Sequence, residues 1–280
     1  MAIAILPFSF CLVLTFFSNE KNSDLHSQRL EERALKEIMI RNDGIYTLLG
    51  SKPVVFFSLS GKSMEEWVLR SYYDDLPETL KERFPFEEVF NYISPWKLWK
   101  IWMDKWEATS VHEGRYLFFR KDLFGYFVNT KEVICILSRH YDDFAKAYGE
   151  DFDPLQVTFE MPDTNSKFWN ALEGNHYLWG LLLGYGEKNA YLFSLVQKGI
   201  LPDLSVRTEP LEEKINQEML HKAIDGMLDM KDLALPGYKS YFYFDQTMNQ
   251  YKEERKKIIE IYSGKDFYKL TLSYLGLDDD

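Results

Sequence analysis

Residues 168–196 hold the longest apolar stretch of the chain after its N-terminus, and four glycines interrupt it. Two of them, Gly180 and Gly184, are four residues apart, so a helix places both on one face. A face without side chains lets another backbone approach closely. The apolar run at 177–185 is much shorter than the roughly 20 residues that cross a bilayer. This pattern predicts a buried helix that packs tightly against a neighbour.

A second helix is expected directly after the first. Gly186 follows the apolar run as a helix C-terminal glycine does, and residues 187–197 carry apolar side chains around most of a helix. Gly199 and Pro202 are placed to end this second helix. The two helices together predict a helical hairpin at the centre of the fold.

The same stretch contains one candidate metal or catalytic pair. Glu173 and His176 are spaced i, i+3, which is the spacing of a Glu-x-x-His metal pair in helical bundles. A two-iron site of that kind needs a second copy of the motif, which the sequence lacks, and Gly174 favours a break in the helix. The competing interpretation is a histidine at a helix start that hydrogen-bonds its neighbours. The pair is therefore an alternative hypothesis, and no metal, cofactor or catalytic residue is assigned.

The composition favours one compact domain of the α+β class. The chain has 280 residues, of which 46% are hydrophobic and 16% aromatic, enough for a sizeable core. We expect residues 19–280 to form a predominantly α-helical domain with a few short strands, and a possible internal boundary in the loop at 199–210. The net charge of −11 argues against general nucleic-acid binding, which depends on Lys and Arg neutralising phosphates.

Residues 1–18 predict export. Residues 2–17 carry no charge and precede a polar run, a length that suits the apolar region of a signal peptide. No basic residue precedes the run and no clear cleavage site follows it, so an uncleaved membrane anchor and a buried N-terminus stay open. We expect an exported protein that is periplasmic, envelope-associated or secreted. If the segment is removed, Cys135 is the only cysteine left, and its apolar surroundings favour a buried thiol.

Tryptophan is concentrated in one predicted helix at residues 96–107. Four of the seven tryptophans lie there, at Trp96, Trp99, Trp102 and Trp106. They cover one side of the helix, opposite its lysines. A stripe of this kind is most typical of a helix that buries its tryptophans in a core. It also fits a helix lying on a membrane surface, or an aromatic platform for a sugar or peptide.

Alternation and turn signals predict the remaining elements. Short strands are expected at 54–57, 116–119, 124–128, 156–159 and 241–244. Further helices are expected at 24–41, 130–148, 211–228, 247–262 and 266–275. The triplet at 42–44 is expected to close the first helix, and residues 48–53 to form a loop.

Short catalytic motifs are incomplete. Residues 60–63 read Ser-Gly-Lys-Ser, the end of a P-loop, but the first glycine of that motif is missing. Around Ser58 both glycines of a nucleophile elbow are missing. His140 lies near Asp142 and Asp143, but adjacent residues of a helix point to different faces.

Three hypotheses for function follow. The first is an exported, envelope-associated binding or structural protein that contacts an unknown protein partner or a membrane surface, with the Trp96–Trp106 helix as a candidate contact. The second is a hydrolase or metalloenzyme with a site near Glu173 and His176. The third is a carbohydrate- or peptide-binding module that uses exposed aromatic side chains. No local motif decides between them, and the sequence leaves open whether the protein is an enzyme.

Overall fold

The computed structural model describes most of the chain between residues 24 and 277. The described residues are 24–59, 70, 73–74, 77–83, 85–86, 95–108, 114–203, 222, 228–238, 240–242 and 245–277. They form many helices and one small antiparallel sheet, which confirms the predicted α+β class. The predicted export segment at residues 1–18 and the motif at 60–63 lie outside these residues, as does most of the loop at 199–210.

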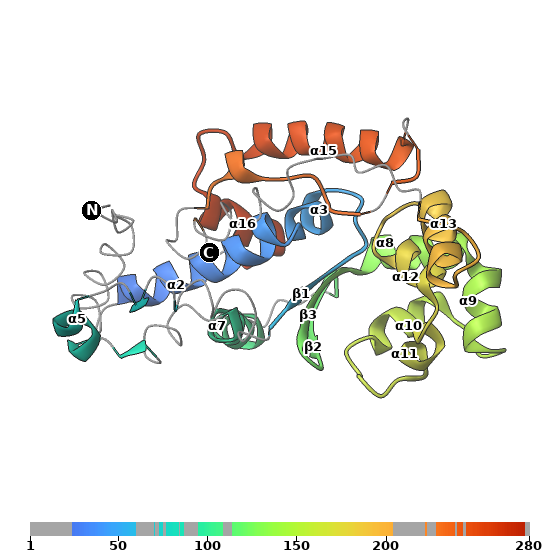
Figure 1. The fold of residues 1–280 in the computed structure, drawn as a ribbon, viewed down its shortest axis with the longest axis horizontal. Coiled ribbons are helices and arrows are strands. Elements are labelled where there is room, and N and C mark those ends of the chain that lie inside the picture. The colour runs from blue at the N-terminus through green and yellow to red at the C-terminus, as the bar shows by residue number, and fades with distance from the viewer. Residues whose placement is uncertain are drawn as a thin grey trace.

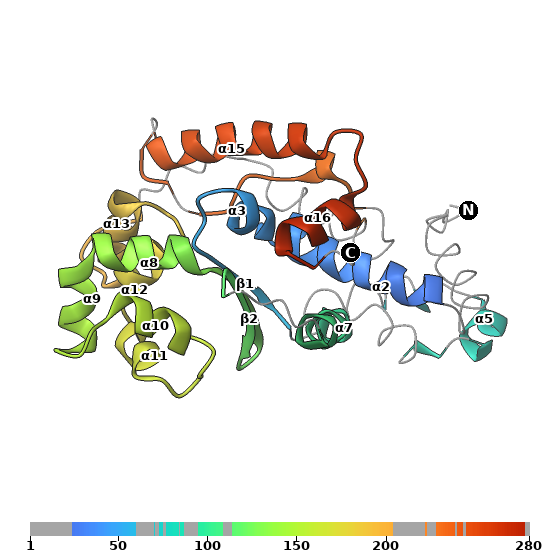
Figure 2. The ribbon, with the colours of Figure 1, turned by 180° about the vertical axis from the view of Figure 1, so that it is seen from behind.

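The helices form two groups: one combines elements from both ends of the described chain, and the other comes from its middle. The first group comprises α2 (Asp24–Lys36), the π-helical turn η1 (Glu37–Arg41), α3 (Gly44–Leu49), α5 (Glu78–Arg83) and α7 (Pro95–Ala108), with η2 (Met230–Asp232), α15 (Gln246–Tyr262) and α16 (Phe267–Leu275) from the C-terminal part. The second comprises α8 (Thr130–Arg139), α9 (Tyr141–Tyr148), α10 (Pro154–Glu160), α11 (Lys167–Leu172), α12 (His176–Leu182) and α13 (Glu187–Gln197). Figures 1 and 2 show the two groups on opposite sides of the sheet.

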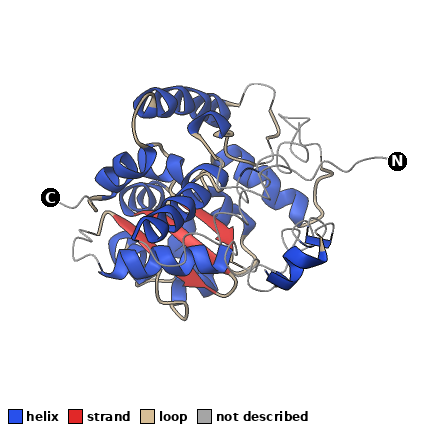
Figure 3. Cartoon of the chain, turned by 90° about the vertical axis from the view of Figure 1, so that its left-hand side faces the viewer, coloured by secondary structure: helices blue, strands red, loops and turns tan. Residues whose placement is uncertain are grey.

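The sheet has three strands, β1 (Val54–Ser58), β2 (Tyr116–Lys121) and β3 (Phe124–Asn129), in the order β1-β3-β2. Both pairings are antiparallel, and β2 and β3 form a hairpin that turns at Asp122 and Leu123. Because side chains alternate along a strand, each face of the sheet carries its own apolar row. Helices cover both faces (Figure 3), and each face therefore belongs to a separate core.

The first core, here called the terminal core, combines segments from both ends of the described chain. It packs the Val55, Phe57, Phe118 and Phe127 face of the sheet against α2, α3, α7, α15 and α16. The tryptophan helix α7 lies in this core. Trp102 is 0% and Trp99 4% exposed, and Trp102 meets the Phe118 ring edge-on at 5.5 Å. Trp106 is also buried, so the described part of the stripe is core; the side chain of Trp96 lies outside the described part.

The second core, here called the middle core, comes almost entirely from one continuous part of the chain. It packs the other sheet face, with Val54, Phe119, Tyr126 and Val128, against α8–α13. The predicted hairpin of α12 and α13 lies here. A Cβ atom on Gly180 would sit 2.6 Å from the Ala190 Cβ, so the missing side chain is what lets the two helices approach.

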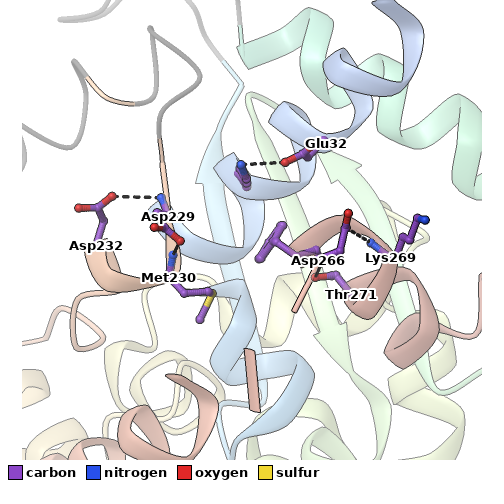
Figure 4. A network of polar contacts seen from close by, with 9 residues as sticks. Glu32, Asp229, Met230, Asp232, Asp266, Lys269 and Thr271 are labelled. Carbon is purple, nitrogen blue, oxygen red and sulfur yellow. Dashed lines mark hydrogen bonds and ion pairs between the residues drawn. The ribbon is translucent and has the colours of Figure 1, made fainter. Parts of the chain in front are cut away.

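Aspartate and asparagine side chains begin most of the helices whose caps are described. Asn129, Asp153, Asn175 and Asp245 each accept a hydrogen bond from a backbone N–H in the first turn of α8, α10, α12 or α15. Figure 4 shows the same chemistry near the C-terminus. There Asp266 accepts from the Lys269 N–H at 2.9 Å, and the Asp232 carboxylate accepts from the Asp229 N–H at 3.0 Å.

Three predictions about local structure are wrong. Residues 156–159 belong to helix α10, because Asp153 caps it and Pro154 occupies its first turn. The helix expected over 130–148 is two helices that break at His140. Cys135 is exposed, because it lies on the face of α8 opposite the buried Val133 and Leu137.

The strand expected at 241–244 is not observed where it is described. Residues 241 and 242 belong to no strand, and 243–244 lie outside the described residues. No helix in the described part of the chain is long and apolar enough to cross a membrane.

Candidate functional site

A cluster of polar and aromatic side chains lies where the two cores meet at α3, α15 and the α12–α13 hairpin. At its centre is Lys52, which is only 4% exposed. It stands between α3 and β1, and Pro53 directly follows it. Its backbone N–H donates to the Tyr46 carbonyl at 3.2 Å, which fixes the loop against the end of α3. Lys52 is the only buried lysine among the described residues.

Two groups of the protein act on the Lys52 ammonium group: the Tyr185 ring and the charge of Asp43. Its Nζ lies 5.8 Å from the centroid of the Tyr185 ring. Within the described part of the chain it makes no hydrogen bond and no close ion pair, although it interacts electrostatically with Asp43. Burial lowers the pKa of Lys52, and the negative charge of Asp43 opposes that shift. The amine therefore keeps unused hydrogen-bonding capacity inside the protein.

Asp43 lies at the start of α3, and its charge acts on Lys52. Its φ of 63° lies in the left-handed region, which is unfavourable for residues other than glycine, asparagine and aspartate. Unlike the capping aspartates described above, its carboxylate makes no hydrogen bond to the helix that it precedes. Burial raises the pKa of Asp43 to about 6, while Lys52 and the Gly237 backbone oppose the shift. Asp43 stays partly exposed, so the cluster reaches the surface there.

Four tyrosines surround this pair. Tyr46 and Tyr251 are buried and meet edge-to-face at 5.6 Å, whereas Tyr185 and Tyr238 are partly exposed and stack at 5.4 Å. Tyr46, Tyr238 and Tyr251 each donate a hydrogen bond, to the Ala234 carbonyl, the Asp245 carboxylate and the Gly184 carbonyl. The Tyr185 hydroxyl makes none within the described residues. Burial, together with the Asp43 charge, raises the pKa of Tyr185 to about 12.

Asp245 fixes one wall of the cluster. Its carboxylate accepts from Ser240 Oγ at 2.6 Å, Asn189 Nδ2 at 2.8 Å and Tyr238 Oη at 3.1 Å, and it also caps α15. Burial alone would raise the pKa of Asp245, but these hydrogen bonds together lower it. The carboxylate is thus a satisfied structural acceptor that ties α13 to α15.

Glycines allow the hairpin to reach the cluster. Gly184 and Gly186 have φ of +75° and +78°. A Cβ at Gly184 would collide with the Tyr251 hydroxyl, and one at Gly186 with Thr247. From the sequence, Gly186 was expected to end the first helix of the hairpin. In the structure α12 ends at Leu182, and Gly186 precedes α13.

The structure places the two residues of the Glu173–His176 pair at the ends of two different helices. Glu173 is exposed and ends α11, Gly174 has φ of +66°, and His176 begins α12. The two side chains therefore do not share a helix face. His176 lies at a helix start, as the competing interpretation expected, but there its ring meets the Phe193 ring edge-to-face at 5.9 Å and makes no hydrogen bond within the described residues.

The group of His140, Asp142 and Asp143 also lacks the arrangement of a metal site. His140 Nδ1 lies 3.9 Å from one Asp143 oxygen, and Asp142 is exposed. Among the described residues, no group of three or more His, Cys, Asp or Glu side chains is arranged to hold a metal ion.

Sequence reasoning missed the Lys52 cluster. Asp43 was interpreted only as part of a helix ending, and Lys52 only as part of a loop. Tyr185 and Tyr238 are far apart in the chain, so no local pattern joins them. The available signal was a lysine directly before Pro53 and a strand of buried residues, a position that leaves little room for solvation.

Comparisons with known proteins found nothing similar. No family model matches the sequence, and neither the curated proteins nor the solved structures contain a match. The site is therefore assessed from its own geometry.

Proposed function

We propose that the protein is a binding protein whose site is the Asp43–Lys52–Tyr185 cluster, and that its ligand is a small molecule rich in hydroxyl groups, as carbohydrates are. One observation carries the proposal: the Lys52 residue is only 4% exposed, its amine makes no hydrogen bond within the described residues, and the charge of the partly exposed Asp43 acts on it. A buried polar group without a partner is unfavourable, so an incoming group that satisfies it gains free energy.

A hydroxyl group matches both sides of the site. Its oxygen accepts a hydrogen bond from a lysine ammonium, and its proton is donated to a carboxylate. A ligand carboxylate or phosphate would satisfy Lys52 but would be repelled by Asp43. The unpaired Tyr185 hydroxyl adds a third polar contact, and the tyrosine rings supply apolar walls. These features favour the carbohydrate-binding hypothesis of the sequence analysis.

The other hypotheses gain less support. Because the described tryptophans of α7 are buried, that helix is not favoured as a contact with a membrane or partner. The separation of Glu173 from His176 removes the basis for a metalloenzyme site there. Export and envelope association rest on residues 1–18 and stay a prediction, which N-terminal sequencing of the native protein would test.

Binding would be tested by calorimetry and saturation-transfer NMR with a panel of uncharged methyl glycosides and oligosaccharides. We expect at least one to bind, and Lys52→Met to abolish that binding. Lys167→Met is the matched control, because Lys167 also lies over a tyrosine ring, Tyr148, at 4.5 Å, but is exposed on the protein surface.

Near-UV circular dichroism would establish that both variants stay folded. Absence of binding across the whole panel, or unchanged binding by folded Lys52→Met, would contradict the proposal. Tyr185→Phe tests the third polar contact separately, because it removes only the unpaired hydroxyl.

A further inference from the structure

Lys52 combines two properties that no other described lysine combines. It is buried, and its amine makes no hydrogen bond within the described part of the chain. Elsewhere lysines are paired or solvated, as for Lys100 with Asp104 at 2.8 Å and Lys256 with Glu253 at 2.7 Å. A binding role explains a buried donor, but the same environment also changes the chemistry of the amine.

A lysine is a nucleophile only in its neutral form. Water stabilises the ammonium form, so removing water favours the neutral amine, and burial lowers the pKa of Lys52 accordingly. The lone pair of Nζ is not used as a hydrogen-bond acceptor by any described group. Desolvated lysines of this kind are the ones that attack carbonyl carbons and form imines.

We propose that Lys52 forms an imine with the carbonyl carbon of a hydroxy aldehyde or hydroxy ketone, such as an open-chain sugar. This inference rests on the proposed function, since the hydroxyl groups of such a compound are what the site would recognise.

The step is balanced without any further reactant. The Nζ lone pair attacks the carbonyl carbon, and proton transfer from nitrogen to oxygen gives a carbinolamine. The carbinolamine hydroxyl then takes a proton and leaves as water, and the C=N bond forms. We assign Asp43 to supply and recover that proton, because it is the carboxylate whose charge acts on Lys52. Its pKa of about 6 allows both protonation states near neutral pH.

The test is reductive trapping on the full chain. The protein is incubated with D-glyceraldehyde or dihydroxyacetone and sodium cyanoborohydride, which reduces an imine to a stable secondary amine. Peptide mass spectrometry then gives the initial rate at every lysine. We expect Lys52 to react measurably faster than the exposed Lys167, because burial lowers the pKa of Lys52 and so raises the fraction of its neutral amine. The Lys52→Arg variant should lose only the fast modification at position 52, and the other lysines should react at unchanged rates.

Modification of Lys52 at the rate of Lys167 or slower would overturn the inference. Asp43→Asn gives a second readout. This substitution also removes the charge that raises the pKa of Lys52, which by itself favours the neutral amine and faster trapping. Slower trapping at Lys52, with Lys167 unchanged, would therefore show the loss of the proton donor, and an equal or faster rate would remove Asp43 from the step. Circular dichroism of each variant before labelling shows that the fold is intact.

The two proposals fail separately. Methyl glycosides have no free carbonyl, so they test binding alone. If a methyl glycoside binds but Lys52 is not trapped, the imine inference fails and the binding proposal stands. If no glycoside binds and glyceraldehyde labels Lys52 no faster than Lys167, both fail.

Discussion

The terminal core and the middle core share one sheet but are built in opposite ways. The middle core takes nearly all its residues from one continuous stretch, where α8–α13 follow each other over residues 130–197. The terminal core joins α2, α3 and α7 to α15 and α16, which come from the far end of the chain. Local contacts form with less loss of chain entropy than distant ones. We therefore expect the middle core to form earlier in folding.

The two cores also differ from their junction in where buried charged side chains lie. Each core, taken alone, is apolar and well packed. The buried charged groups lie instead at the junction, where Lys52 and Asp245 are enclosed by elements from both. A site built at such a junction depends on both cores being formed.

The largest expected effect is on the terminal core. Trp102→Ala removes a fully buried ring that packs on Phe118, and should lower the free energy of unfolding by about 3–5 kcal/mol. Chemical denaturation would measure it, with hydrogen exchange of α13 amides recorded in parallel. Because the sheet is shared, we expect those middle-core amides to lose protection as well. Full retention of their protection would show that the cores unfold independently.

The junction itself can be opened at one glycine. Gly184→Ala places a methyl group against the Tyr251 hydroxyl at a φ of +75°, and should cost about 3 kcal/mol from backbone strain and overpacking together. Gly174→Ala is the control, because its φ of +66° is similar but nothing lies within 4 Å of the added Cβ. Backbone strain alone should cost about 1–2 kcal/mol there. Equal thermal shifts in the two variants would argue against a tight junction.

The site should make stability depend on pH. The pKa of Asp43 is raised from 3.8 to about 6, so the folded state binds a proton more readily than the unfolded state. The resulting stabilisation is complete below about pH 4 and is lost as the pH rises through about 6. Over this pH range the free energy of unfolding should fall by about 2–3 kcal/mol because of Asp43. Asp43→Asn should remove this pH dependence. The free energy of unfolding, measured from pH 4 to 7, gives the slope; a variant that keeps it would exclude Asp43 as its source.

The smallest effect is expected at Cys135, on the outer face of the middle core. Cys135→Ser should change stability by less than about 0.5 kcal/mol, because the side chain is exposed. The native protein should also alkylate at Cys135 without denaturant, as peptide mass spectrometry would show. Protection from iodoacetamide in the folded protein would instead restore the buried thiol expected from the sequence.

The sequence predicted those elements whose signals lie within a few neighbouring residues. The strands at 54–57, 116–119 and 124–128, the tryptophan helix and the α12–α13 hairpin were all predicted, because alternation, turn residues and glycine spacing are local signals. Residues 156–159 were misassigned, because their strand-like pattern competes with a capping Asp153 and Pro154.

The candidate site was not predicted, for the opposite reason. Lys52, Tyr185 and Tyr238 meet only through tertiary packing, so no spacing in the sequence relates them. The pair that spacing did suggest, Glu173 and His176, is divided by a helix break at Gly174.

Helix α15 has a consequence for the order in which a ribosome completes the molecule. It contributes Tyr251, whose hydroxyl binds the Gly184 carbonyl at 2.8 Å, and Glu254, which accepts from the Ser51 N–H at 3.2 Å. These contacts cover the loop that carries Lys52, and Glu254 lies 203 residues after Ser51 in the chain. Until α15 has left the ribosome, the loop around Lys52 lacks both of these hydrogen bonds. The loop that carries Lys52 gains this cover only after α15 has been synthesised and has docked.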